Sequence, residues 1–290
     1  MDGNDQNQQK PKEKISDLTI ISERINCFIP SIGILLDDAN ASGDFSRIEG
    51  IAKEQAAAGV TYLDVNVDTL PNAMMARIVN AIQGIVDVPL CIDSVDPSKL
   101  AAGLMAYDYK KANGIPPILN SATESKSVEI FPLRQKRDCG IVLMLSETGT
   151  DVDGLFYRAL DAGFEPEQVY LDPSIIPFYA DYEGGLKRTL DTLERVSSNP
   201  DMVHSLIGLT NFVQGLPREI KKKARLPLQN ALLTLAMERG LDTIIGDPEV
   251  PYKKLGDGDE TLVTLKTIAS AKDMSDVCHL VLEFCHKFEK

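Results

Sequence analysis

Carboxylate and amide side chains recur at the ends of short apolar segments along this chain. Ionised carboxylates only accept hydrogen bonds, whereas asparagine both donates and accepts them. A pocket of such groups suits a flat heterocycle with adjacent N–H donors and ring acceptors, and a carboxylate opposite an amino-substituted cyclic amidine makes a paired, charge-assisted contact. Pterins present such an edge. The carboxylate and amide residues are Glu23, Asn26, Asp64, Asn66, Asp68, Asp93, Asn120, Asp172, Asn211 and Asp247, and Ser94 and Ser121 follow Asp93 and Asn120.

Each of these residues also has a purely structural interpretation. Asp or Asn directly after a strand is a common helix N-cap or turn former. Asp64 lies inside an alternating strand, and a structural role explains it at least as well as a functional one. The convergence of many such residues on strand ends is what favours a ligand site.

The segments that must position these residues alternate between two periodicities. Short apolar and β-branched segments predict strands at 18–26, 61–67, 89–95, 116–122, 141–147, 168–174, 204–211 and 242–247. Segments with helical periodicity lie between them, near 44–58, 71–86, 97–107, 126–138, 151–163, 183–197, 227–239 and 258–271. Asp96-Pro97 suits a helix start. Left-handed helix ends are predicted at Gly59, Gly140, Gly163 and Gly240.

Eight such units with apolar strands predict an α/β fold, a closed (β/α)8 TIM barrel, with an open doubly wound sheet as the alternative. In a barrel, active sites lie at the carboxyl ends of the strands, where the polar residues fall. Residues 1–16 are polar and predict a disordered arm, and residues 17–290 predict a single domain. A last amphipathic segment, 275–288, is expected to pack outside the barrel or at a subunit contact.

Composition excludes several classes of partner. A formal charge of −13 and a pI near 4.7 argue against nucleic acid, whose binding needs Lys and Arg to neutralise phosphates. No apolar run is long enough to span a membrane. The five cysteines are scattered and odd in number, without a CxxC motif, which is typical of reduced thiols in a cytoplasm. Cys278 and Cys285 are expected to face inward from the last helix rather than to bind metal.

Other chemistries lack the residues they need. The three histidines, His204, His279 and His286, give no good candidate for a catalytic triad. Neither HExxH nor a Gly-rich phosphate loop occurs. A glycosidase pair of carboxylates fits a barrel, but the chain has no Trp and only 6% aromatic residues to stack on a sugar. We therefore expect no metal ion bound by this chain.

Six motifs at these strand ends carry a resemblance to a known family. They are SERIN (22–26), DVNVD (64–68), CIDS (91–94), LNSATE (119–124), YLDPSIIP (170–177) and GLTNFVQGLP (208–217). In this order they resemble the motifs of the pterin-binding methyltransferases, over residues 18–272. That family includes methyltetrahydrofolate:corrinoid methyltransferases and the folate module of cobalamin-dependent methionine synthase. The resemblance implies a TIM barrel of the pterin-binding type.

The resemblance also implies roles for individual residues. Those that match the pterin-holding positions are Asp93, Asn120 and Asp172, and Asn211 matches the Asn near N5, the nitrogen that carries the methyl group. Asn66 and Gln214 are further candidates for lining the pocket. We interpret Asn211 as a hydrogen-bond donor that stabilises the charge developing at N5, since no strong acid is evident nearby.

Two residues depart from the family's pattern. Ser22 stands where Gly is usual and Thr210 where Ser is usual. Both are small, so the pocket is expected to persist while its preference among pterins changes.

The activity implied by the resemblance is exchange of a methyl group between N5 of methyltetrahydrofolate or tetrahydrofolate and the cobalt of a corrinoid. The sequence has neither a second Rossmann-like domain nor a DxHxxG motif, so the cobalamin cofactor is expected on a separate corrinoid protein. A homodimer is expected by analogy. The direction of transfer, and tetrahydromethanopterin as the carrier, stay open.

Two alternatives remain. Dihydropteroate synthase shares the barrel, but its STRP-type segment is replaced here by Thr69-Leu70-Pro71 and its basic anchor near the last strand by Gly246-Asp247-Pro248. The second alternative is a pterin-binding subunit without catalysis.

Overall fold

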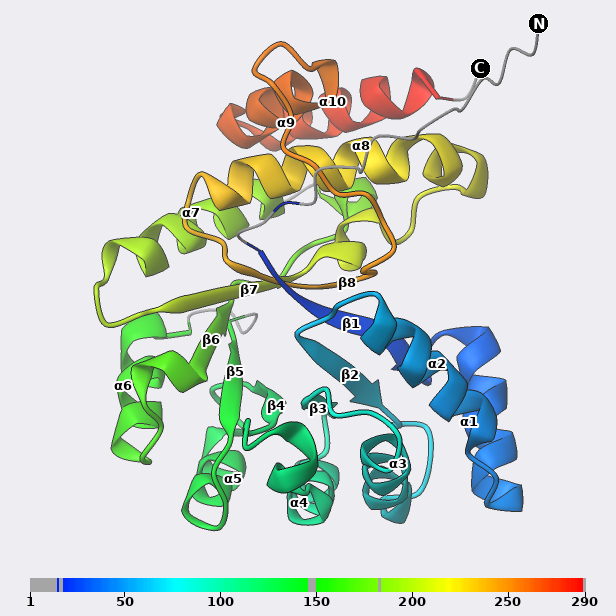
Figure 1. Cartoon of the computed structure of the whole chain (residues 1–290). Helices are drawn as coiled ribbons and strands as arrows, with labels where there is room; N and C mark the ends of the chain where they lie inside the picture. The colour runs from blue at the N-terminus through cyan, green and yellow to red at the C-terminus, as the bar shows by residue number, and fades with distance from the viewer. Residues whose placement is uncertain (1–14, 16–17, 146–149, 182–183, 289–290) are drawn as a thin grey trace, which may run out of the picture.

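Eight parallel strands close into a barrel in the order in which they occur along the chain (Figure 1). The computed structural model describes residue 15 and residues 18–145, 150–181 and 184–288. The closed (β/α)8 barrel is therefore confirmed, and the open sheet is excluded. The strands are β1 (Thr19–Asn26), β2 (Tyr62–Asn66), β3 (Leu90–Asp93), β4 (Ile118–Ala122), β5 (Gly140–Met144), β6 (Val169–Asp172), β7 (His204–Gly208) and β8 (Thr243–Gly246).

Helices surround the barrel, and the last two lie beyond α8 on one side of it (Figure 1). They are α1 (Pro30–Ser42), α2 (Ser46–Ala57), α3 (Ala73–Gln83), α4 (Pro97–Ala106), α5 (Ser127–Ile130), α6 (Val152–Asp161), α7 (Gly185–Ser198), α8 (Arg218–Met237), α9 (Glu260–Ser270) and α10 (Met274–His286). Short 3₁₀ helices are η1 (Tyr109–Ala112), η2 (Phe131–Gln135), η3 (Pro166–Gln168), η4 (Phe178–Ala180) and η5 (Leu209–Val213). None of these helices within the described ranges is long and apolar enough to cross a bilayer.

Some predicted segments lie outside the described residues. The arm predicted for 1–16 is among them, apart from Ile15. So are the end of the strand predicted for 141–147 and the first residue of the helix predicted for 183–197.

Three helix predictions were wrong, each through a proline or glycine. Helix α1 was not predicted, because Pro30 and Gly33 weaken the helical signal; burial of Ile32 and Leu36 stabilises it. The helix predicted to start at residue 227 begins at Arg218, with Pro227 inside it. The helix predicted for 126–138 is instead the short α5 followed by the 3₁₀ helix η2, which contains Pro132.

Helix boundaries were predicted better. Asp96 caps α4 by accepting from the Ser98 N–H, with a proline in the first helical turn. Gly59, Gly163 and Gly240 are left-handed, as predicted, with φ of 79°, 99° and 87°. Gly140 was assigned wrongly: it begins β5, and a Cβ there would lie 3.1 Å from the Gln168 carbonyl oxygen, so close strand packing explains this glycine.

The barrel interior contains an apolar layer one inward position below the carboxyl ends of the strands, here called the lower layer. Ile21, Cys91, Ile118, Val142 and Leu206 form one buried cluster, contributed by five different strands. Toward the amino ends of the strands, the interior contains Tyr170 stacked on His204 at 4.9 Å between ring centroids, and His204 contacts Asp242 at 2.6 Å. The barrel is therefore filled at this end.

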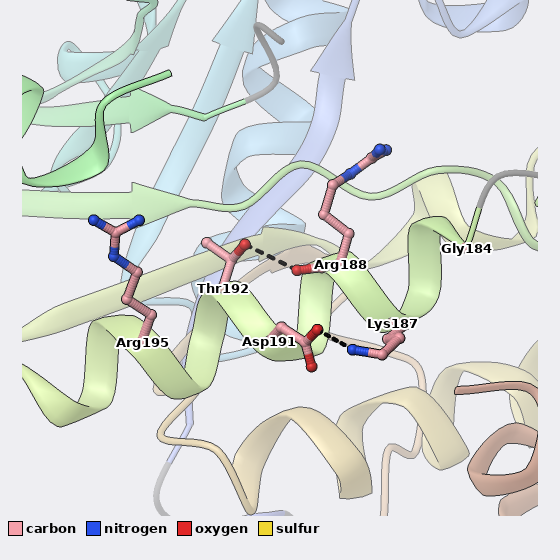
Figure 2. Close-up of a pocket in the computed structure, with 6 residues that line it drawn as sticks. All are labelled: Gly184, Lys187, Arg188, Asp191, Thr192 and Arg195. Carbon is pink, nitrogen blue, oxygen red and sulfur yellow. Dashed lines mark hydrogen bonds and ion pairs between the residues drawn. The ribbon is translucent and has the colours of Figure 1, made fainter. Parts of the chain in front are cut away.

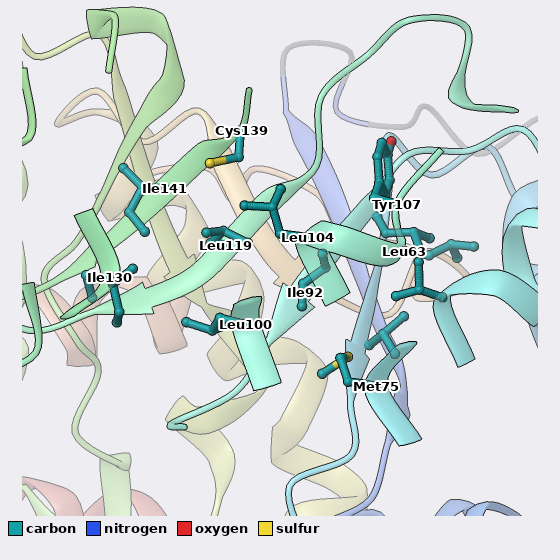
Figure 3. Packing of buried hydrophobic residues seen from close by; sticks show 14 of the residues in the cluster. Leu63, Met75, Ile92, Leu100, Leu104, Tyr107, Leu119, Ile130, Cys139 and Ile141 are labelled. Carbon is teal, nitrogen blue, oxygen red and sulfur yellow. The ribbon is translucent and has the colours of Figure 1, made fainter. Parts of the chain in front are cut away.

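A second apolar layer lies between the outside of the barrel and the helices (Figure 3). Its side chains come alternately from strands and from the helices that cover them. The labelled members are Leu63, Met75, Ile92, Leu100, Leu104, Tyr107, Leu119, Ile130, Cys139 and Ile141. In α10, Cys285 is buried as predicted, whereas Cys278 is half-buried.

Close packing of α4 on β3 depends on Gly103. A Cβ at this position would lie 2.8 Å from Ile92 Cγ2 and 2.9 Å from Met75 Cγ. We expect Gly103→Ala to lower the free energy of unfolding by about 1–2 kcal/mol in urea titrations, because overpacking outweighs the gain in helix propensity. Gly50→Ala on α2 is the matched control, since nothing lies within 4 Å of its Cβ. It should stabilise by up to about 1 kcal/mol; stabilisation by both variants would contradict the packing argument.

Candidate functional site

Strand register brings three of the predicted site residues to one level of the barrel. Asn66 on β2 pairs with Asp93 on β3, and Asp93 pairs with Asn120 on β4. Side chains alternate between the two faces of a sheet. Asp93 and Asn120 therefore face inward, each two residues beyond a member of the lower apolar layer, Cys91 or Ile118. The upper layer of the interior is thus polar and lies at the carboxyl ends of the strands.

Asn66 is held in place by three contacts. Its Oδ1 accepts from the Asp68 N–H at 3.0 Å and from the Cys27 thiol at 3.1 Å, and its Nδ2 donates to Asp93 Oδ2 at 2.9 Å. The side chain is only 5% exposed. Asn66 therefore orients the Asp93 carboxyl, and protein groups already occupy its own polar atoms.

Asp93 and Asp172 are two carboxyl groups that favour protonation. Burial raises the pKa of Asp93 to about 7; the hydrogen bond from Asn66 opposes this rise. Burial also raises the pKa of Asp172 to about 7, against the N–H of Ser174, which donates to Asp172 Oδ1 at 2.8 Å. Ser174 has a left-handed backbone, with φ of 60°, and this turn directs its N–H back toward the carboxyl group. Both carboxyl groups therefore have acceptor atoms in a poorly solvated environment.

Asp64 faces the same barrel interior, although from the sequence alone a structural role explained this residue at least as well as a functional one. It is 1% exposed and lies two residues before Asn66 on β2, hence on the same inward face. Burial, followed by the negative charge of Asp93, holds the pKa of Asp64 well above its ordinary value. Its Oδ1 has no hydrogen-bond partner among the residues that the structure describes. Strand alternation was the signal that could have identified it.

Asn211 and Gln214 lie after β7, which is next to β6 and across the barrel from β3. Both are exposed, and Gln214 Nε2 donates to Asn211 Oδ1 at 2.7 Å. The Asn211 amide nitrogen lies over Gly208, where an added Cβ would approach it to 2.7 Å. Asn211 therefore presents its NH₂ group as a donor at the end of β7. It sits in the 3₁₀ helix η5 rather than in the predicted strand 204–211.

Glu23 on β1 adds a carboxyl group next to Asn211. Thr210 donates its hydroxyl hydrogen to Glu23 Oε2. Burial raises the pKa of Glu23, and the hydrogen bond from Thr210 followed by the charge of Arg225 oppose that rise. This hydrogen bond joins the titratable Glu23 to Thr210, the residue directly before Asn211.

Two other polar strand ends, Asn26 and Asp247, form local turns, whereas Asp68 links the loop after β2 to the loop after β3. Asn26 Oδ1 accepts from the Phe28 N–H at 2.9 Å, and Asp247 Oδ1 from the Glu249 N–H at 3.0 Å. Asp68 accepts from the Val95 N–H at 3.0 Å. These residues shape the loops around the mouth.

The mouth therefore combines buried carboxyl acceptors on β2, β3 and β6 with an amide donor after β7. Within the described parts of the chain, no three His, Cys, Asp or Glu side chains are grouped to hold a metal ion. The set suits an uncharged or cationic heterocycle with several N–H donors, because such a ligand supplies the partners that the buried carboxylates need.

A hollow on the outside of α7 is a weaker candidate site (Figure 2). It measures about 350 Å³ and is lined by Gly184, Lys187, Arg188, Asp191, Thr192 and Arg195. Lys187 pairs with Asp191, and Arg195 pairs with Asp153 of α6 at 2.7 Å. Most of its charged groups are thus already neutralised by neighbours.

Comparison with known proteins shows the family to which the chain is similar. A family model described as "Pterin binding enzyme" matches residues 36–247. Methylcorrinoid:tetrahydrofolate methyltransferase from Eubacterium limosum is 26% identical over 250 residues, which cover 80% of this chain and 85% of that protein.

Solved structures with a similar fold include two dihydropteroate synthases. The enzyme from Xanthomonas albilineans, in complex with 7,8-dihydropteroate, has a TM-score of 0.50 and 15% identity, covering 88% of this chain and 94% of that one. The enzyme from Stenotrophomonas maltophilia has a TM-score of 0.50 and 16% identity, covering 86% and 89%. At these identities the likeness concerns the fold alone.

Asp172 should make the free protein less stable at alkaline pH. Its pKa is about 7 in the folded chain and near its ordinary value of 3.8 in the unfolded chain, so folding is favoured below pH 4 and this contribution is lost as pH rises through 7. We expect Asp172→Asn to raise the free energy of unfolding by roughly 1–3 kcal/mol at pH 8. At pH 4 the effect should nearly vanish.

Thermal unfolding at both pH values measures this difference. Asp191→Asn on α7 is the control for the same change of charge at an exposed site. An equal effect of Asp172→Asn at pH 4 and pH 8 would contradict the assignment of a protonated, buried Asp172.

Proposed function

The chain belongs to the pterin-binding enzyme family, and we propose that it transfers a methyl group between N5 of tetrahydrofolate and a corrinoid carried by a separate protein. The observation that carries the proposal is the meeting of two buried carboxyl groups, Asp93 and Asp172, with the amide donor of Asn211 at one barrel mouth. The relative from Eubacterium limosum, whose name states this pair of substrates, supports it.

The buried carboxylates bind the pyrimidine edge of the pterin. Its amino group and ring N–H donate to Asp93 and Asp172, while Asn120, at the same level as Asp93, supplies a further donor and acceptor. Asn66 acts by orienting Asp93. Because the ligand's N–H groups favour the ionised carboxylates, binding lowers the pKa values of Asp93 and Asp172.

Asn211 acts at the methyl-bearing nitrogen. A reduced corrinoid, when bound, supplies the nucleophile that accepts the methyl group. As the C–N5 bond breaks, its electron pair remains on N5, which must gain a proton. The Asn211 NH₂ group, held by Gln214, donates a hydrogen bond that stabilises this nitrogen. Glu23, held by Thr210, is the carboxyl group that we assign to exchange the proton.

Exposure of the N5 side suits a reaction with a second protein. Asn211 and Gln214 are both exposed at the mouth, so a methyl group beside them faces outward. A rigidly bound ring would hold the methyl group in line with an approaching acceptor.

Dihydropteroate synthase activity is the second candidate function, and only the similarity of the fold supports it. The residue after β8 argues against this activity, because Asp247 occupies the position where that enzyme has a basic anchor. The Oδ1 atom of Asp247 accepts from the Glu249 N–H and so caps the following turn. An assay of methyl transfer to or from a corrinoid protein also distinguishes a transferase from a pterin-binding subunit without catalysis.

Ligand affinity should depend on Asp172 and on pH. We expect Asp172→Asn to weaken binding of methyltetrahydrofolate by more than about tenfold at pH 7.5, since a neutral amide cannot make the charge-assisted contact. The wild type should lose about tenfold or more between pH 7.5 and pH 6, as carboxyl groups with pKa values near 7 become protonated. Calorimetric titrations of both proteins test this, with Asp191→Asn as the control. Unchanged affinity in Asp172→Asn would refute the assignment.

Methyl transfer should depend on Asn211 more than binding does. We expect Asn211→Ala to lower kcat by about 100-fold while Kd changes by less than about threefold, because the donor acts mainly on the charge that develops at N5. Absorption spectra of a corrinoid protein mixed with methyltetrahydrofolate measure interconversion of cobalt(I) and methyl-cobalt(III). Asn80→Ala on the exposed face of α3 is the matched control. No transfer by the wild type, despite tight folate binding, would indicate a subunit without catalysis.

A further inference from the structure

The first turns of α8 carry an unusual concentration of positive charge. Residues 218–225 include five cations, Arg218, Lys221, Lys222, Lys223 and Arg225, and a single anion, Glu219. The protein as a whole has a net charge of −13. Cations at a helix N-terminus are unfavourable because they face the positive end of the helix dipole. Folding of α8 therefore does not explain this cluster.

Two of the five cations have partners within the protein. Lys222 pairs with Glu219 at 3.2 Å, and Lys223 donates to the Phe288 carbonyl oxygen at 3.3 Å. Arg218, Lys221 and Arg225 form no ion pair with any residue described in the structure. Arg218 is exposed, whereas Lys221 and Arg225 are half-buried. Half-buried cations that form no ion pair are the ones best placed to bind an anion from a ligand.

Lys221 and Arg225 lie in the first turns of α8, which begins shortly after η5 at the carboxyl end of β7. They lie one helical turn apart, on the flank of a face whose residues Ile220 and Ala224 are buried. Both charges act on the carboxyl group of Glu23 and oppose the burial that raises its pKa. Glu23 is the mouth residue next to Asn211, through its hydrogen bond with Thr210. The two cations thus border the same mouth as the ligand site.

We propose that Lys221 and Arg225 bind the glutamate carboxylates of the folate tail. This inference rests on the proposed function, which puts N5 of the folate beside Asn211. Residues 214–217 lead directly from η5 into α8, so a tail that leaves the ring past Asn211 meets the first turns of α8. A folate monoglutamate ends in two carboxylates, and the guanidinium of Arg225 and the ammonium of Lys221 are their complementary donors.

The α7 hollow offers a contrast (Figure 2). There Lys187 already pairs with Asp191 and Arg195 with Asp153, so the local anions are supplied by the protein itself. Clustered cations alone are therefore not the distinguishing feature of α8. Its distinction is that Lys221 and Arg225 make no ion-pair contact with a described residue and lie beside the mouth.

The test compares two ligands of equal size on the full-length protein. One is methyltetrahydrofolate, and the other is its diamide, in which both glutamate carboxylates are primary amides. Calorimetric titration at low salt gives Kd for the wild type, Lys221→Gln, Arg225→Gln and the control Lys222→Gln. We expect the wild type to bind the acid about three- to tenfold more tightly than the diamide, with a difference that shrinks as salt screens the charges.

Each possible result is decisive. Lys221→Gln and Arg225→Gln should reduce the preference for the acid and leave Kd for the diamide unchanged, while Lys222→Gln retains the preference. Equal binding of acid and diamide by the wild type would overturn the tail site and leave the proposed function intact. Binding of neither ligand would instead overturn the proposed function. Variants that raise KM for the corrinoid protein without changing either Kd would assign the cations to the partner protein and overturn the proposal.

Discussion

Closure of eight strands into a barrel forces alternate side chains into one narrow interior, and the rest of the structure depends on how that interior is filled. The lower layer is apolar and includes Ile21, Ile118 and Leu206. On β3 and β4 the next inward positions carry a carboxyl and an amide group, Asp93 and Asn120. The apolar layer excludes water from below, and this makes the layer above it a poorly solvated place for a charge.

That burial links stability to ligand binding. Asp93 and Asp172 each have a pKa of about 7, so the protonated and the ionised carboxyl groups are both populated near neutral pH. The fold favours the protonated form, whereas a bound hydrogen-bond donor favours the ionised form. In the free protein, ionisation of either group costs stability. A ligand with paired N–H donors offsets that cost and so gains affinity from it. The free fold is thus less stable than an apolar barrel would be, as is common where a site must bind polar groups.

The mouth is assembled from two kinds of element. The strands β2, β3, β4 and β6 supply acceptors at fixed positions, since a ladder of backbone hydrogen bonds sets their level. The segment after β7 supplies donors and cations: Asn211 in η5, then Lys221 and Arg225 in α8. In our proposals the first group holds the ring, while the second acts on N5 and on the tail. Recognition and transfer would then come from different elements of one barrel mouth.

The sequence by itself determined the barrel, its strand order and the polar character of its mouth. Hydrophobic periodicity is a local property, and Asp93, Asn120, Asp172 and Asn211 each follow their own apolar segment. Tertiary structure decided what local patterns cannot encode. Helix α8 extends through Pro227 because burial of one face outweighs a missing N–H.

Packing likewise decided which polar residues belong to the site and which form turns. Only the register of β2 against β3 shows that Asn66 orients Asp93, and only burial separates Asp64, inside the barrel, from Asn26 and Asp247, which form turns. An Asp at a strand end has the same local sequence signal whether it faces a cavity or caps a turn. The physical difference is solvation, which depends on every strand of the closed barrel at once.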